Sequence, residues 1–151
     1  MPSSPIHDES LDLLEAVQAA RRDARFIEQV RGLLDEAQDS VTHAVSTCEA
    51  CGKCCMFEQA GHRLYCSTGE LAIITSGPLC QWQEGRCAFL RANRCHNRSD
   101  RPLGCRMYFC KVQNEPLYEK FHARVRWLHQ HHGVPYFYVE MTRAAKALGG
   151  A

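Results

Sequence analysis

The fold of this chain is decided by the stretch 11-LDLLEAVQAARRDARFIEQVRGLLDEAQDSVTHA-44, where apolar side chains recur at steps of three and four. They are Leu11, Leu14, Val17, Ala20, Ala24, Ile27, Val30, Leu34, Ala37, Val41 and Ala44. This period predicts an amphipathic helix, or two in series with a break near Gly32. Asp8 or Ser10 is predicted to cap its start. We expect its apolar face to pack in the core rather than to bind a dedicated partner.

Helical spacing returns after Cys110. Pro116 is placed for a helix start, Leu117, Phe121, Val125 and Leu128 follow, and Gly133 supplies a stop. The next segment, 134-VPYFYVE-140, is aromatic and β-branched, which predicts a short extended piece in which Pro135 argues for an edge or an irregular course. A last amphipathic turn or two runs from Met141 through Leu148.

Between these helical ends the period disappears, and glycines and prolines predict loops and turns without a long strand. The exception is 67-STGELAIITSG-77, a predicted short helix. Ser67 or Thr68 can cap it, and Glu70, three residues after Ser67, completes a capping box.

The length of 151 residues predicts a single domain, 1–151, of mainly α class. Its parts are an N-terminal helical segment (1–47), a cysteine-rich core (48–110), and a C-terminal part (111–151) with a helix, a short extended segment and a terminal helix. The middle part cannot bury much apolar surface by itself. We therefore expect a metal cluster to nucleate it, so that ligation contributes to the free energy of folding.

Ten cysteines are far more than such a chain ordinarily carries. The start, MPSSPIHDES, has neither the cationic nor the apolar region of an export signal, and no later run reaches the length of a membrane span. We therefore expect a cytoplasmic protein, in which thiols are kept reduced. Metal or cluster binding is favoured over a disulfide framework and over reactive thiols.

The densest cysteine stretch is 48-CEACGKCC-55. Its C-x-x-C-x-x-C spacing is the one with which bacterial ferredoxin loops present three thiolates to one cubane. Cys54 and Cys55 are adjacent, and neighbouring side chains rarely meet on the same small ion. The pair therefore favours a polynuclear cluster, or two neighbouring sites, over a single zinc held by four thiolates.

Charge is unevenly distributed along the chain. Residues 1–47 carry nine acids against four arginines, a net charge of −5, whereas residues 85–111 carry seven basic residues against Asp100, a net charge of +6. The basic segment can neutralise the negative charge of a thiolate-bound cluster and donate hydrogen bonds to sulfur. Nucleic-acid binding is the competing interpretation, and it is disfavoured because the whole chain is near neutral and contains no recognised nucleic-acid motif.

The cysteine pattern resembles that of a known family. The segments CxxCGKCC (48–55), C-x-F-L (87–90), R-C (94–95) and R-P-L-x-C-R-x-Y-x-C (101–110) are similar in order and spacing to the YkgJ-like CxxCxxCC family of cysteine-cluster proteins. Members of that family are described as zinc- or iron-chelating. The family is linked by similarity to flagellin lysine N-methylase, in which an iron–sulfur cluster is expected.

The resemblance implies a metal- or cofactor-binding set of eight residues: Cys48, Cys51, Cys54, Cys55, Cys87, Cys95, Cys105 and Cys110. Cys66 and Cys80 lie outside this set and are extra ligands, part of a second site, or thiols without a ligand role. His96 stands where the family usually has another residue type, and a structural role is favoured for it over a ligand role.

The remaining histidines and aromatic residues have ordinary interpretations. His129, His131 and His132 are expected to stabilise the end of their helix, and His62 is expected to be a hydrogen-bonding loop residue. Tyr136, Phe137 and Tyr138 are expected to pack in the core rather than over a cluster. No hydrolase arrangement and no methyltransferase cofactor fold is visible.

The leading functional hypothesis is an iron–sulfur protein of the [4Fe-4S] type that acts in electron transfer or as an accessory or sensor protein. The alternative is a zinc-binding structural or interaction module with two all-cysteine, four-ligand Zn²⁺ sites. A third is a redox-sensing thiol protein. A redox protein would be the partner of the first, and neither membrane nor nucleic acid is expected as a partner. The sequence assigns no reaction, so catalysis stays undecided.

Overall fold

The computed structural model describes residues 9–42, 64–75, 90–91, 94–95, 101–109, 112–113 and 115–149. These residues are mainly helical, as the sequence predicts. The helices are α1 (Glu9–Arg22), α2 (Ala24–Thr42), α4 (Thr68–Ile74), α5 (Leu103–Met107), α6 (Glu115–His132) and α7 (Met141–Gly149). The strands are β1 (Tyr65–Ser67), β2 (Leu90–Arg91), β3 (Arg94–Cys95), β4 (Tyr108–Phe109), β5 (Val112–Gln113) and β6 (Tyr138–Glu140).

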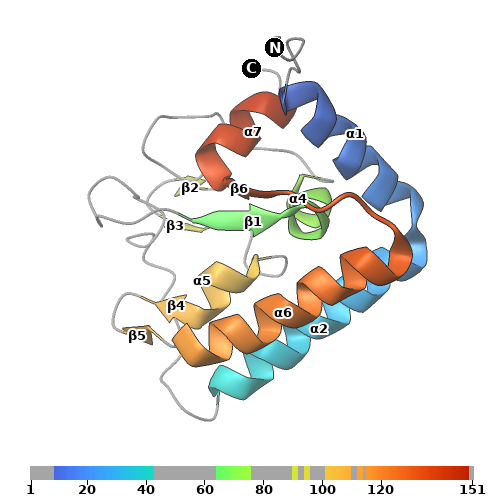
Figure 1. Ribbon diagram of the computed structural model, residues 1–151. Coiled ribbons are helices and arrows are strands. Elements are labelled where there is room, and N and C mark those ends of the chain that lie inside the picture. Colours follow the sequence, from blue (N-terminus) through green and yellow to red (C-terminus); the bar gives the residue numbers. More distant parts are fainter. Residues whose placement is uncertain are drawn as a thin grey trace, which may run out of the picture.

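The helices surround a small central layer (Figure 1). The two long helices α2 and α6 pack side by side, and α5 packs against both of them. At the other end α1 packs against α4 and α7. The short helix α4 and the strand pair β1–β6 lie between these two helical groups, so residues from the whole length of the chain contribute to one core.

The helix break in the N-terminal segment lies at Asp23, so the prediction of a break near Gly32 was wrong. Asp23 Oδ1 accepts a hydrogen bond from the backbone N of Phe26 at 3.0 Å, which is the geometry of a helix N-cap. Gly32 lies inside α2, where it costs some stability but does not end the helix. A side chain that caps a helix start is therefore a stronger break signal here than glycine.

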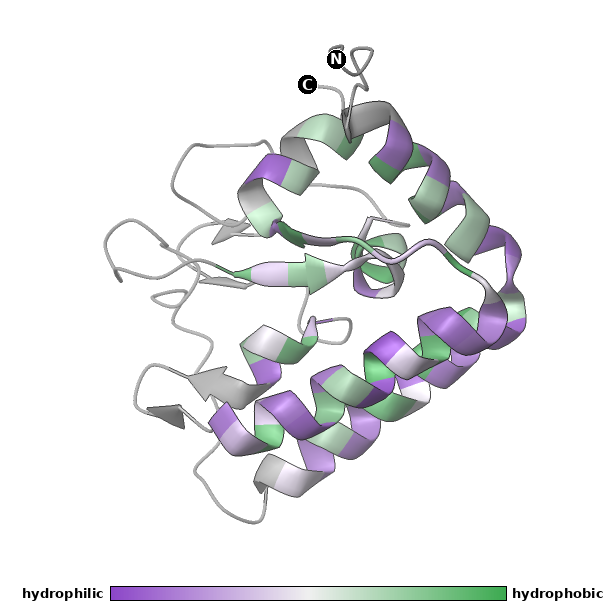
Figure 2. Cartoon of the chain, in the orientation of Figure 1, coloured by the Kyte–Doolittle hydropathy of each residue, from purple (hydrophilic) through white to green (hydrophobic). Residues whose placement is uncertain are grey.

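The core is hydrophobic and comes from several helices. Its largest fully buried apolar side chains are those of Phe26, Phe121, Leu34, Leu71, Ile73, Leu103 and Met141. All seven residues of α4 are buried, which makes α4 the central helix of the fold. Figure 2 shows hydrophobic and hydrophilic residues together along α2 and α6, the pattern of amphipathic helices. The described helices and strands, which we call the frame, thus share a core built mainly from aliphatic and aromatic side chains.

The predicted helix signals at α4 and α6 are confirmed. Ser67 caps α4, and the reciprocal bonds of a capping box with Glu70 are both present. Helix α6 begins at Glu115, one residue before the Pro116 predicted as a start. Gly133 follows its last residue with φ of 68°, a left-handed conformation that glycine adopts without a steric penalty.

The predicted extended segment after Gly133 contains a strand at its end. Strand β6 pairs antiparallel with β1, with Cys66 opposite Val139 and Ser67 opposite Tyr138. Residues 134–137, including Pro135, belong to no strand, which agrees with the irregular course expected there. The pairing closes a loop of about 70 residues, and Thr68 N strengthens it by donating to Phe137 O at 3.0 Å.

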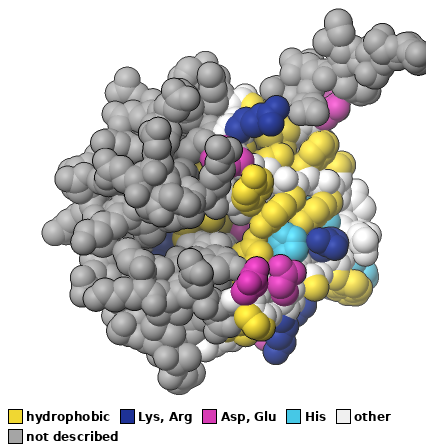
Figure 3. Space-filling view, turned by 60° about the vertical axis from the view of Figure 1, so that its left-hand side comes forward, with side chains coloured by type: hydrophobic (Ala, Val, Ile, Leu, Met, Phe, Trp, Pro, Cys, Tyr) yellow, Lys and Arg dark blue, Asp and Glu magenta, His cyan; other side chains and the backbone are white. Residues whose placement is uncertain are grey.

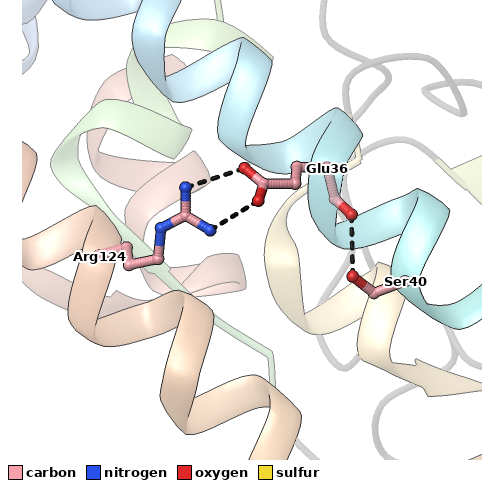
Figure 4. Close-up of polar contacts among 3 residues, drawn as sticks. All are labelled: Glu36, Ser40 and Arg124. Atoms are coloured by element: carbon pink, nitrogen blue, oxygen red, sulfur yellow. Dashed lines mark hydrogen bonds and ion pairs between the residues drawn. The ribbon is translucent and has the colours of Figure 1, made fainter.

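Helices α2 and α6 are also joined at the surface. Nη1 and Nη2 of Arg124 donate to Oε1 and Oε2 of the Glu36 carboxylate, at 3.0 and 2.8 Å (Figure 4). Within α2, the hydroxyl of Ser40 donates to the backbone O of Glu36 at 3.0 Å. Both partners are about half-exposed, so solvent screens this ion pair.

Within the described ranges, no helix combines the length and apolar character needed to cross a membrane.

Candidate metal centre

Two of the eight predicted ligands lie in described elements. Cys95 is the last residue of β3, and Cys105 lies in the middle of α5. The other six lie outside the described residues: Cys48, Cys51, Cys54, Cys55, Cys87 and Cys110. Cys80, His62 and His96 lie outside them as well.

Cys105 is held on a short helix at the edge of the core. Its side chain is partly buried and packs against the hydrophobic cluster, and its backbone N donates to Pro102 O at 3.1 Å. The neighbouring Gly104 allows α5 to approach Leu64 closely, because a Cβ at Gly104 would lie 2.5 Å from Leu64 Cδ1. Cys105 therefore sits at a defined place in the frame.

Two short antiparallel strand pairs belong to the cysteine-rich part of the sequence. In one, β2 pairs antiparallel with β3, with Leu90 opposite Cys95. In the other, β4 pairs antiparallel with β5, with Phe109 opposite Val112. Cys110 and Lys111 are the two residues between β4 and β5 in the sequence.

A buried polar network around Glu70 joins α4 to α5. The Glu70 carboxylate accepts hydrogen bonds from Ser67 and from the backbone N of Leu103. Burial raises the pKa of this carboxyl, and the hydrogen bonds from Leu103 and Ser67 and the charge of Arg106 oppose that rise. A buried carboxyl with this many donors is structurally constrained rather than available to solvent.

Two arginines of the basic segment have contacts within the frame. Arg101 Nη2 donates to Gln38 Oε1 of α2 at 3.0 Å. Arg106 is buried, its Nε donates to Arg101 O at 2.7 Å, and its Nη1 lies 4.0 Å from Asp35 Oδ1. These two side chains therefore tie α5 to the acidic N-terminal segment, a role that the charge pattern alone did not reveal.

Cys66 belongs to the hydrophobic core. Its side chain is fully buried, and its Sγ lies 3.9 Å from Met141 Sδ at the start of α7. Thiol and thioether groups both pack well among apolar side chains. Of the roles left open for Cys66, core packing is the one that this environment favours.

The histidines of α6 have individual structural contacts. His129 is completely buried, with Nδ1 at 2.8 Å from Val125 O and Nε2 accepting from Gly69 N at 3.0 Å. His132 Nδ1 lies 3.2 Å from Asp23 Oδ2, at the α1–α2 junction. His129 therefore does more than stabilise the end of its own helix, because its contact with Gly69 joins α6 to the central helix α4.

A cluster of tyrosines around His122 was not predicted from the sequence. His122 is buried and stacks on Tyr118, and its Nε2 lies 2.7 Å from Tyr136 Oη. The hydroxyls of Tyr118 and Tyr138 contact each other, and Tyr138 stacks on Tyr65. Tyr118 and His122 are four residues apart in a predicted helix, and this spacing could have indicated that their rings meet.

Two tyrosines of this cluster reach the surface, where Tyr65 and Tyr138 are 41 % and 38 % exposed. Figure 3 shows one face of the molecule, on which hydrophobic side chains gather beside histidine, basic and acidic side chains. His122 Nδ1 is buried and has no hydrogen-bond partner among the residues that the structure describes. Burial, followed by the charge of Arg126, lowers the pKa of His122, while Glu119 opposes this shift.

In the described part of the chain, no three His, Cys, Asp or Glu side chains come together in a group that could hold a metal ion. Comparison of the chain with protein-family models, with curated proteins and with solved structures finds no match. The resemblance to the CxxCxxCC family therefore rests on the cysteine motifs themselves.

Proposed function

We propose that this chain is an iron–sulfur protein of the [4Fe-4S] type that transfers electrons or serves as an accessory or sensor protein. The observation that carries the proposal is the spacing of eight cysteines, beginning with C-x-x-C-x-x-C-C. The proposed ligand pool is Cys48, Cys51, Cys54, Cys55, Cys87, Cys95, Cys105 and Cys110.

The donor set fits such a group chemically. Thiolates are the ligands of cubane clusters, and the pool exceeds the four that one cubane needs, so it suffices for two centres or a larger cluster. Cys105, partly exposed on a helix with several tertiary contacts, is suited to be a rigid ligand. The bound group would supply one-electron redox chemistry, and the chain's own residues would hold it and limit its exposure to water.

The frame also supports the proposal through its connections. Cys48, Cys51, Cys54 and Cys55 lie in the sequence between the end of α2 at Thr42 and the start of β1 at Tyr65. Helix α5, which carries Cys105, packs against α2. The basic segment 85–111 would offset the negative charge of a thiolate-bound cluster.

The proposal is tested by purifying the full chain without oxygen and measuring visible absorption, iron, acid-labile sulfide and zinc on one sample. A brown protein with iron and sulfide in equal amounts is the expected result. A colourless protein with about two zinc ions per chain would replace the proposal by the zinc module, with Cys54 and Cys55 divided between two sites. Absence of both metals would favour a thiol-based redox sensor.

A further inference from the structure

The side chain of Glu70 is only 1 % exposed, and both of its oxygens accept hydrogen bonds. Oε1 accepts from the backbone N of Ser67 at 3.2 Å and from the Ser67 hydroxyl at 2.8 Å. Oε2 accepts from the backbone N of Leu103 at 2.8 Å. A capping box needs only the bonds to Ser67. The bond to Leu103 therefore connects α4 to a different helix, 33 residues further along the chain.

Leu103 is the first residue of α5, and the first backbone N–H groups of a helix have no partner within it. Helix α5 has only five residues, too few for it to be stable by itself. Its position and rotation must therefore come from tertiary contacts. The Glu70 carboxylate supplies one at the start of α5, and the buried side chain of Leu103 supplies another.

Two arginines also hold α5. Arg106, 4 % exposed, donates to Arg101 O, and Arg101 in turn donates to Gln38 of α2. The charge of Arg106 also acts on Glu70 and opposes the rise of its pKa that burial causes. Glu70, Arg101 and Arg106 thus all contribute contacts that fix α5, the helix that carries Cys105.

We propose that Glu70 is a positioning residue for the metal centre: by holding the first N–H of α5, it fixes Cys105 in place before any metal binds. Outer groups usually orient a ligand by a direct hydrogen bond. Here the carboxylate acts through the backbone N–H of Leu103, at the start of the helix that carries Cys105. A ligand that is already fixed loses less conformational entropy when it binds. That Cys105 binds a metal or cluster rests on the proposed function, whereas the fixing of Cys105 by Glu70 does not.

The test compares Glu70→Gln with Ser67→Ala in the full chain. Oε1 of Glu70 accepts two bonds from Ser67 and Oε2 accepts one from Leu103 N, so the single amide oxygen of Glu70→Gln is expected on the Ser67 side. Its NH2 group then faces the N–H of Leu103, and the Leu103 bond is lost. Ser67→Ala removes the hydroxyl that caps α4 but leaves the Leu103 bond in place. The two variants therefore separate weakening of α4 from release of α5.

The first readout uses metal-free, reduced protein and follows the alkylation rate of Cys105 with iodoacetamide by mass spectrometry. We expect Glu70→Gln to alkylate several-fold faster at Cys105 than wild type, and Ser67→Ala to alkylate at the wild-type rate. Equal rates in wild type and Glu70→Gln, or equal acceleration in both variants, would overturn the proposal.

The second readout titrates the same proteins with cobalt(II) and records thiolate-to-cobalt charge-transfer absorption. Glu70→Gln should bind cobalt roughly 10- to 100-fold more weakly than wild type, as for other groups that orient metal ligands. Unchanged affinity together with an unchanged spectrum would contradict the proposal. A wild-type protein that binds no metal would refute the proposed function, and the alkylation rates would still decide whether Glu70 positions Cys105.

A second variant covers the case in which Glu70→Gln does not fold. Gly104→Ala places a Cβ 2.5 Å from Leu64 Cδ1, so either α5 or the buried Leu64 side chain on which it is seated must shift, while Glu70 is unaltered. It should accelerate alkylation of Cys105 as Glu70→Gln is expected to do. A wild-type rate in folded Gly104→Ala would show that the seating of α5 does not control Cys105, and the proposal would fail.

Discussion

The backbone N of Gly69 donates a hydrogen bond of 3.0 Å to Nε2 of His129, and this contact joins the central helix α4 to α6. Because Nε2 accepts, the proton of the neutral ring lies on Nδ1, which donates to Val125 O. The ring of Phe26 packs edge-on against His129, with 4.8 Å between the ring centroids. Gly69, His129 and Phe26 thus form the point where α2, α4 and α6 meet.

Replacement of Gly69 by alanine should destabilise the protein, although alanine is the better helix former. The added Cβ would lie 2.9 Å from Phe26 Cζ and 3.3 Å from His129 Cε1, and both rings are fully buried. Overpacking of this kind costs about 1–3 kcal/mol. Urea denaturation followed by circular dichroism measures the change in the free energy of unfolding.

Gly32→Ala is the matched control, since Gly32 is also a helical glycine but has nothing within 4 Å of an added Cβ. It should stabilise the protein by about 0.5–1 kcal/mol. If the two substitutions shifted the urea midpoint in the same direction, the close packing described around Gly69 would be wrong.

Acid should weaken the fold through buried histidines. Burial lowers the pKa of His129 and of His122 below the ordinary value of 6.5. The unfolded chain therefore binds protons that the folded chain does not, and the free energy of unfolding falls as pH decreases below about 6.5. The limiting slope is about 1.4 kcal/mol per pH unit for each histidine. Urea denaturation of metal-free protein between pH 7.5 and 5 measures it.

His122→Phe keeps an aromatic ring beside Tyr118 and removes one of these titrating groups, so it should reduce the slope by about one proton. His131→Phe is the matched control for the replacement itself, because His131 is exposed on the same helix. An acid slope that is equal in wild type and His122→Phe would count against a neutral, buried His122.

Alkali should act on the tyrosine cluster. Burial, aided by contact with Tyr138, raises the pKa of Tyr118, and burial raises the pKa of Tyr138 to about 12. The unfolded phenols ionise near pH 10, so this contribution to stability is present below about pH 10 and is lost as pH rises toward 12. An ultraviolet titration of folded protein should therefore show fewer ionised phenols at pH 11 than the five in the chain. Ionisation of all five at that pH would contradict the burial described.

Local signals were the part of the fold that the sequence revealed best. The capping box of Ser67 and Glu70 and the stop at Gly133 depend on residues three or fewer positions apart, and both are confirmed. The pairing of β1 with β6 was not predicted, because its partners are more than 70 residues apart and β1 has only three residues. Likewise, the bond from Leu103 to Glu70 has no signature in sequence spacing.

The helical period in the N-terminal segment predicted most of the buried positions but failed next to the break. Val17, Ala20, Val30, Leu34 and Ala37 are buried, as the period predicts, whereas Ala24 is exposed and Phe26 is fully buried. The period was followed without interruption through Asp23, where the cap of α2 ends one helix and starts the next. Phe26, one of the largest fully buried side chains, was missed for that reason.

The candidate site was predictable only as a set of ligands. The motif around 101–110 indicated Cys105, but not that Arg101, Leu103 and Arg106 hold its helix. The arginines were interpreted as neutralising the negative charge of a cluster, because the net charge of a segment follows directly from the sequence. Their partners on α2 and α4 depend on tertiary packing and could not be predicted in that way. That the eight cysteines bind a metal or cluster stays a prediction.

The central claim is that an iron–sulfur cluster is bound by a helical frame with its own hydrophobic core. It is tested most directly by recording visible absorption and far-ultraviolet circular dichroism together while an iron chelator is added to the anaerobically purified protein. We predict that the visible absorption disappears while the helical ellipticity is largely retained. Ellipticity that falls in step with the absorption, or a protein with no visible absorption at the outset, would contradict the account.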